Sequence, residues 1–259
     1  MQPQPAWAPP PQPERRRTGL LVALILVVVL LLVAALTGIG VYLYRAYGNS
    51  TLPSGLASAG FRVSDPSARE EVGKLLVGRL GPNARYAVRP NGVLIGVPRA
   101  ERGTLTTLAA ATPMRTEVSL NAVLSTGSGS SPSPAPSPGR TLPSQSGKES
   151  YTVGPAVLTG TQVKSVESHN DSTVGGRVVI VTFNSAGSKQ LATFTEQQVG
   201  KRLAIVTVGV VVSAPTVQAP ITGGAVQISG LRSEAEADGI VAAFQLGQRP
   251  VTISAGDPG

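Results

Sequence analysis

An unbroken apolar run near the N-terminus constrains this chain more than any other feature. Every residue from Leu20 to Leu36 is Leu, Val, Ile or Ala. A helix needs about 20 apolar residues to cross a hydrocarbon core of about 30 Å. We therefore predict one transmembrane helix over residues 19–44. The residues expected to hold it in the lipid bilayer, the last two as aromatic anchors at the interface, are Leu20, Leu30, Leu36, Tyr42 and Tyr44.

The charges beside this run predict its orientation. Three arginines at 15–17 precede the run, and only Arg45 follows it directly. Positive charge stays on the cytoplasmic side, so residues 1–18 should be inside and the rest of the chain outside a bacterial cell membrane. A cleaved signal peptide is the alternative, but its apolar region would be about 7–15 residues long. A twin-arginine export signal fits the flanking residues poorly.

Composition narrows the classes of function. The 259 residues include no Cys, which excludes disulfides, thiolate metal sites and a lipid-modified Cys. The net charge of +8 lies within residues 1–149, whereas residues 150–259 balance to zero. With few aromatics, this distribution disfavours nucleic acid as a partner. The basic excess in 52–124 fits either an anionic lipid or wall polymer or a merely solvated surface.

The sequence divides into seven segments. Pro- and Ser-rich composition predicts disorder at the N-terminus and a flexible linker in the middle of the chain. The segments are a tail at 1–18, the membrane helix at 19–44, a spacer at 45–54, a first folded region at 55–125, a linker at 126–150, a second folded region at 151–254 and a tail at 255–259.

The first folded region begins with a helix signal. Asp65 is a suitable N-cap and Pro66 suits the first helical position. An apolar stripe follows at helical spacing, and Gly81 to Asn83 should end the helix. Strands are expected at 85–88 and 93–97 around a turn at 90–92, then a helix at 101–111 and a strand at 114–120. This order predicts an α+β fold with helices on one sheet face.

The second folded region again predicts an α+β fold. Strands are expected at 178–183, 203–212 and 225–229, and Asn184 should cap a helix. Ser233 and Glu236 have the spacing of a capping box that opens a helix. The predicted fold class for the whole chain is thus α+β, one transmembrane helix followed by two small α+β subdomains.

An ordered series of motifs in residues 151–253 resembles a known family. The runs are VGKRLAIV at 199–206, VVSAP at 211–215 and PITGGAVQISG at 220–230. Together they resemble the head subdomain of the first extracytoplasmic region of SecD, a membrane component of protein export. Residues 55–125 resemble the base subdomain of the same region. Val208 departs from the Asp usual in that family.

The resemblance implies a binding role in export. It implies that the head contacts unfolded exported protein or the Sec translocon, and that this chain is a single-span SecD-like protein without the multi-helix membrane bundle. The segment between Pro215 and Gly224 is either a partner-contacting loop or simply structural. The residues assigned to partner binding are Ser213, Ala214, Pro215, Ile221, Thr222, Gly223 and Gly224.

Enzymatic chemistry has little support in the sequence. His169 is the only His and is expected in a polar loop, with no signal for a nucleophile, a base and an oxyanion site. No metal-ligand spacing and no phosphate-binding glycine loop are present. We therefore predict no enzyme activity, no cofactor and no metal. The leading hypothesis is an export-assisting binding module, and the alternative is a cell-envelope interaction or scaffold module with no role in export.

Overall fold

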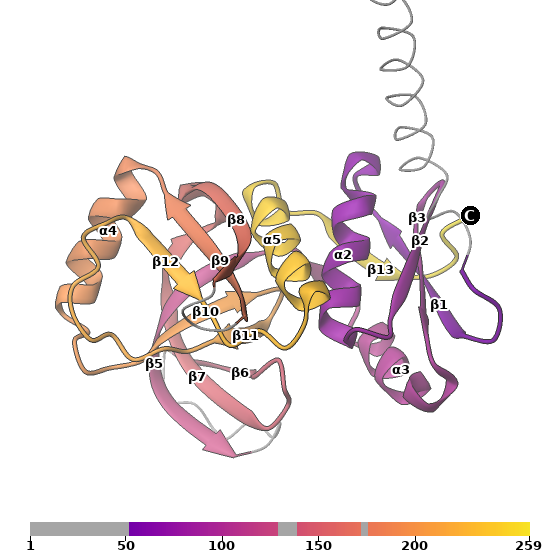
Figure 1. Cartoon of the computed structure of the whole chain (residues 1–259), viewed down its shortest axis with the longest axis horizontal. Coiled ribbons are helices and arrows are strands. Elements are labelled where there is room, and N and C mark those ends of the chain that lie inside the picture. The colour runs from indigo at the N-terminus through magenta and orange to yellow at the C-terminus, as the bar shows by residue number, and fades with distance from the viewer. Residues whose placement is uncertain (1–51, 129–138, 172–175) are drawn as a thin grey trace, which may run out of the picture. The chain divides into compact units, whose positions relative to one another are not determined.

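The computed structural model describes residues 52–128, 139–171 and 176–259, all within one unit of the chain, Ser50–Gly259. These residues form three sheets, two of five strands and one of three. The ladders between the named strands are all antiparallel. A fold of small antiparallel sheets with packed helices is mixed α and β, as the sequence predicts (Figure 1).

The first sheet has the strand order β2-β3-β1-β13-β4. Its apolar residues alternate along β1 and β3, so one face carries Phe61 and Val63 together with Val93 and Ile95. Helices α2 and α3 pack against this face. The elements are β1 (Ala57–Val63), α2 (Arg69–Leu80), β2 (Arg85–Arg89), β3 (Gly92–Val97), α3 (Arg102–Ala110), β4 (Met114–Arg115) and β13 (Thr252–Ala255).

The predicted start of the first helix is confirmed with one refinement. The Asp65 side chain accepts a hydrogen bond from the Ser67 backbone N–H at 2.9 Å. Pro66 begins a short 3-10 turn, Pro66–Ala68, before the α-helical hydrogen bonds of α2 start at Arg69. The helix ends at Gly81, whose φ of 109° is in the region that favours glycine. The hairpin around residues 90–92 and the helix near 101–111 are also confirmed.

The predicted strand at 114–120 is wrong, because this segment crosses between two sheets. Met114 and Arg115 form β4 in the first sheet, whereas β5 (Val118–Ser128) belongs to the second. Thr116 lies at the crossing and is fully buried. Its backbone N–H and side-chain oxygen bond the backbone of Val251, at 3.0 and 2.9 Å. Alternation alone could not show that the partner strand changes within the run.

Residues near 250 complete the first sheet rather than the second. Strand β13 pairs with β1 on one side and with β4 on the other. Residues 252–254, which the sequence assigns to the second folded region, thus share a sheet with residues 57–63. Ile253 is fully buried in the core of that sheet.

The second sheet has the order β11-β10-β5-β7-β6. Its two edge strands approach each other, since Ser144 forms a bridge with Val211 and the Gln145 N–H donates to the Val211 carbonyl at 2.9 Å. Both faces of β10 are covered, and all five of its residues are buried. The strands are β6 (Arg140–Pro143), β7 (Glu149–Thr159), β10 (Leu203–Thr207) and β11 (Val210–Ser213). Strand residues therefore occupy both described ends of the predicted linker 126–150.

The long strand predicted at 203–212 is instead a hairpin. Strands β10 and β11 pair through a turn at Val208 and Gly209, which have φ values of 49° and 77°. Positive φ at both central positions is typical of a type I′ hairpin turn, which usually carries Asn or Asp before Gly. A β-branched residue is rare in this conformation, so the sequence carries no turn signal at Val208.

The third sheet and two helices complete the fold. The sheet has the order β12-β9-β8, and its strands are β8 (Val163–Asp171), β9 (Gly176–Phe183) and β12 (Ala225–Ile228). Helix α4 (Ser185–Glu196) is capped by Asn184, as predicted, and α5 (Glu234–Gln248) by Ser233. Leu191 and Phe244 from these helices are fully buried in one core with residues of the second and third sheets.

The capping box predicted for α5 forms only in part. The Ser233 side chain accepts from the Glu236 N–H at 3.2 Å, as expected. The Glu236 carboxylate, however, accepts from the backbone N–H of Arg232 at 2.7 Å, one residue before the cap. It also accepts from Gln145 at 3.0 Å. Glu236 therefore links the start of α5 to the segment after β6, and this contact is long-range.

Helices α2 and α5 cross at a pair of glycines (Figure 1). A Cβ atom added to Gly239 would lie 2.8 Å from the Gly78 Cα and 3.1 Å from the Lys74 carbonyl oxygen. A Cβ atom on Gly78 would lie 2.7 Å from the Ala235 carbonyl oxygen. Such distances leave no room for a side chain, so the two glycines allow the helix backbones to touch.

The predicted membrane helix precedes the described residues. Within 52–128, 139–171 and 176–259, no helix has the length and apolar character needed to span a membrane. The span at 19–44, including Leu20 to Leu36 and the two tyrosines Tyr42 and Tyr44, lies outside the described residues and stays a prediction.

Candidate functional site

The first part of the predicted partner-binding segment runs beside β10. Ser213 ends β11, and the next two residues continue the contact through their backbone. The Ala214 carbonyl accepts from the Arg202 side chain at 2.8 Å, and the Pro215 carbonyl accepts from the Leu203 N–H at 2.9 Å. Backbone atoms of these residues are therefore occupied, while the Pro215 side chain is exposed.

The second part of the segment is attached to α4. The Ile221 N–H donates to the Thr195 side-chain oxygen at 2.9 Å, and Ile221 packs on the core below. Thr222 and Gly223 are exposed. Gly224 has a φ of 67°, and a Cβ atom there would lie 2.3 Å from the Ser188 Oγ, so only glycine fits.

The segment as a whole is a fixed, uncharged surface loop. Residues 213–224 contain no charged side chain, and most side chains between the two attachment points are exposed. Val217 is the buried exception, and its backbone bonds Lys201 and Gly200 at 2.9 Å each. Such a loop offers apolar and backbone contacts to a partner, and it has no group for acid–base chemistry.

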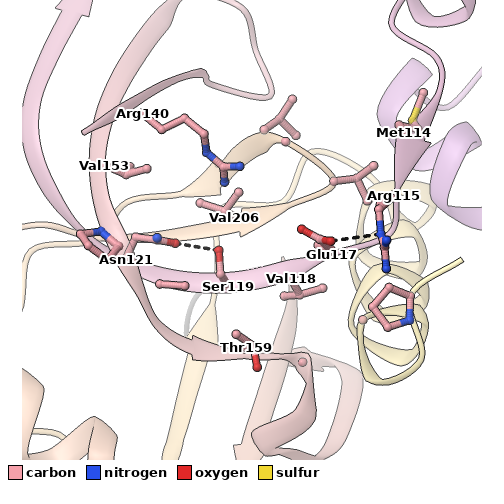
Figure 2. Close-up of a pocket in the computed structure, with 18 of the residues that line it drawn as sticks. Met114, Arg115, Glu117, Val118, Ser119, Asn121, Arg140, Val153, Thr159 and Val206 are labelled. Atoms are coloured by element: carbon pink, nitrogen blue, oxygen red, sulfur yellow. Dashed lines mark hydrogen bonds and ion pairs between the residues drawn. The ribbon is translucent and has the colours of Figure 1, made fainter. Parts of the chain in front are cut away.

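A cavity of about 870 Å³ lies elsewhere in the described residues, where the two five-stranded sheets meet the ends of α2 and α5. Its lining residues come from α2, the β4–β5 segment, strands β6 and β7, the β10–β11 hairpin and the C-terminal end of α5. The walls are partly apolar, with Val118, Val153 and Val206 among them (Figure 2). Ligand-binding pockets commonly have volumes of about 300–1,000 Å³.

Three arginines and one glutamate are the charged residues among the described lining of this cavity. Arg115 pairs with Glu117 at 3.1 Å, and both side chains are exposed (Figure 2). Arg79 and Arg140 form no ion pair within the described ranges. The lining therefore has a net positive charge.

Arg79 is the most constrained of the three. It is partly buried, its Nη2 donates to the Val208 carbonyl at 2.9 Å, and its Nη1 lies 3.7 Å from the Met114 sulfur. Burial in a low-dielectric environment disfavours the charged form and lowers the pKa of Arg79 to about 10. The guanidinium remains charged at neutral pH.

A polar pair forms part of the cavity wall. The Ser119 hydroxyl donates to the Asn121 side-chain oxygen at 2.7 Å (Figure 2). The Asn121 amide donates to the Gly154 carbonyl at 2.8 Å. Asn121 is buried, and its bond to Gly154 joins β5 to β7 where the register between the two strands shifts. The pair is therefore structural, with one edge facing the cavity.

The structure also corrects the surroundings of His169. This residue lies exposed on strand β8, paired with Val178 of β9, and not in a loop. The described parts of the chain contain no cluster of His, Cys, Asp or Glu that could hold a metal ion. The sequence carries no local motif for the cavity, because its lining residues come from six separate segments.

The second half of this chain is similar to a family of head subdomains. Residues 139–251 match the family model described as the SecDF P1 head subdomain. The resemblance seen in the sequence motifs is thereby confirmed for this region. The matched range begins at the start of β6 and ends just before β13.

The particular relatives are subunits of the protein translocase. The chain is 38% identical over 100 residues to the protein translocase subunit SecD of Acidaminococcus fermentans, covering 39% of this chain and 24% of that protein. It is 39% identical over 101 residues to the subunit SecDF of Thermus thermophilus, covering 39% of this chain and 14% of that protein. The chain thus spans a quarter or less of these relatives.

Among solved structures, the crystal structure of SecDF from Thermus thermophilus, a translocon-associated membrane protein, is similar to this chain. The sequence identity is 24% and the TM-score is 0.44, with 80% of this chain and 31% of that chain covered.

Proposed function

We propose that this protein is a membrane-anchored, extracytoplasmic SecD-like binding module that assists protein export by contacting translocating protein or the translocon. The match of residues 139–251 to the SecDF P1 head subdomain carries this proposal. The relatives that share this region are translocase subunits. In this proposal, residues 19–44 form a single membrane anchor, and a base-like part at 55–125 supports the head.

The surface of the head supports binding rather than catalysis. The loop 213–224 has no charged side chain and is fixed at both ends by backbone hydrogen bonds. Extended polypeptides of varied sequence share only their backbone and a general apolar character, which such a loop can contact. We assign the contact to the seven predicted residues, with Thr222 and Gly223 as the exposed centre.

Site-specific photo-crosslinking of the full chain in living cells tests the role in export. A photoreactive amino acid at Gln218 or Thr222 should form adducts with a secretory protein stalled during export, or with translocon subunits. The same amino acid at Arg102, exposed on α3, is the matched control and should not. Adducts with cell-wall components only, together with normal export in a deletion strain, would instead support an envelope module without a role in export.

The absence of Cys in the chain allows a clean test of topology. A T222C variant carries a single thiol, which a membrane-impermeant maleimide should label in intact cells. A Q4C variant should be labelled only after the cells are opened. Labelling of Q4C in intact cells, or a mature N-terminus beyond Tyr44, would contradict the proposed anchor.

A further inference from the structure

We propose that the cavity between the two five-stranded sheets binds an acidic side chain of an extended polypeptide whose neighbouring residues are apolar. The cavity is separate from the loop 213–224, because none of the residues of that loop lines it. The inference rests on the proposed function in one respect, namely that the ligand is a polypeptide.

The lining of the cavity has a net positive charge. Among the described lining residues, Arg115 already has an ion pair with Glu117, while Arg79 and Arg140 have none. Arg140 is exposed, with its guanidinium extended toward Val206 (Figure 2). The site therefore offers two arginines to an anion and no competing carboxylate beyond Glu117. Guanidinium groups bind carboxylates through paired, charge-assisted hydrogen bonds.

The hydrogen bonds of Arg79 leave part of its guanidinium available to a ligand. A guanidinium has five N–H donors, and that of Arg79 contacts the Val208 carbonyl and the Met114 sulfur. These contacts fix the orientation of the group at the wall of the cavity and leave further donors for a ligand. Because Arg79 is partly buried and lacks a carboxylate partner, an incoming carboxylate would offset its desolvation.

The remaining walls indicate what surrounds the carboxylate. Valines from β5, β7 and β10, with Pro143 and Pro155, line the same cavity. A volume of about 870 Å³ admits more than a single carboxylate group. A short peptide with Glu between apolar residues fits both the charge and the walls, whereas a small inorganic anion would leave the apolar walls unfilled.

Calorimetric titration of the full chain in nanodiscs of neutral lipid tests the inference. The probes are two acetylated and amidated peptides, VAELEAV and VAQLQAV, so that the Glu side chains are the only carboxylates. We expect the Glu peptide to bind at least about tenfold more tightly than the Gln peptide. This preference should weaken when NaCl is raised from about 50 mM to about 500 mM.

Two variants connect the preference to the cavity. R140Q should lose most of the preference for the Glu peptide, and R79K should reduce it because Lys lacks the planar fork. R102Q removes an exposed arginine outside the cavity and should keep the full preference. Equal affinities of the two peptides for the unmodified chain, or an equal loss in R102Q, would overturn the inference.

The outcome is distinguishable from that of the crosslinking experiment. A Glu preference that requires Arg140, without adducts from Gln218 or Thr222 to exported proteins or translocon subunits, supports the cavity and contradicts the proposed role in export. Adducts without a Glu preference support the export role and reject this use of the cavity.

Discussion

Gly78 and Arg79 are neighbours on α2, yet their surroundings in the molecule are very different. Gly78 lies against the backbone of α5, where there is no space even for a Cβ atom. Arg79 turns to the cavity beside it, where about 870 Å³ is open. The contact at Gly78 leaves no room for a side chain, whereas Arg79 presents its charge to the cavity. The comparison shows that an open cavity can lie directly beside a close contact between two helix backbones.

Adding a single methyl group at the helix crossing should have the largest effect. G239A places a Cβ atom 2.8 Å from the Gly78 Cα, so the helices must separate. We expect a loss of about 3 kcal/mol in the free energy of unfolding, measured by chemical denaturation. G103A is the matched control, since a Cβ atom at that helical glycine meets nothing within 4 Å. It should stabilise the protein by up to about 1 kcal/mol, and equal losses in both variants would contradict the close contact.

Removing the buried hydroxyl at the sheet crossing should have an intermediate effect. T116V conserves shape but leaves the Val251 N–H without the acceptor that lies 2.9 Å away. An unsatisfied buried donor costs about 1–3 kcal/mol, to be measured by thermal unfolding. T116S keeps the hydroxyl and should lose clearly less. A T116V variant as stable as T116S would show that this bond does not hold the crossing.

Changing the charged wall of the cavity should have the smallest effect on stability. Arg140 is exposed and has no ion pair within the described residues, so R140Q should change the free energy of unfolding by less than about 0.5 kcal/mol. Its effect should appear in peptide binding instead. A strongly destabilised R140Q would show that the residue serves the fold and would remove the contrast with the helix crossing.

The sequence predicted those parts of the fold that local chemistry determines. Asp65, Asn184 and Ser233 each have a short polar side chain placed before an apolar helical stripe, and each caps a helix in the structure. The hairpin at 90–92 has a turn signal in its own residues. Such signals act within a few residues, so the caps and the turn form independently of how distant parts of the chain pair.

The pairing of strands that are distant in the sequence could not be predicted from such local signals. The hairpin at Val208 lacks the Asn or Asp that usually marks such a turn, and the φ of Val208 is 49°, a value that a β-branched residue rarely adopts. The split of residues 114–120 between two sheets depends on partners far along the chain. The cavity depends most on distant residues, since Arg79 and Arg140 are 61 residues apart in the sequence. The predicted loop 213–224 was located by resemblance, and its role as a partner-binding site stays a proposal.

The place of β13 between β1 and β4 has a consequence for how the protein is made. On the ribosome, residues 57–115 emerge well before residues 252–255, which pair with both of those strands. Until the later residues leave the exit tunnel, the edge of β1 that faces β13 has no native neighbour. The earliest part of this domain to be synthesised is therefore among the last to reach its final form, and it needs shelter from aggregation in the meantime.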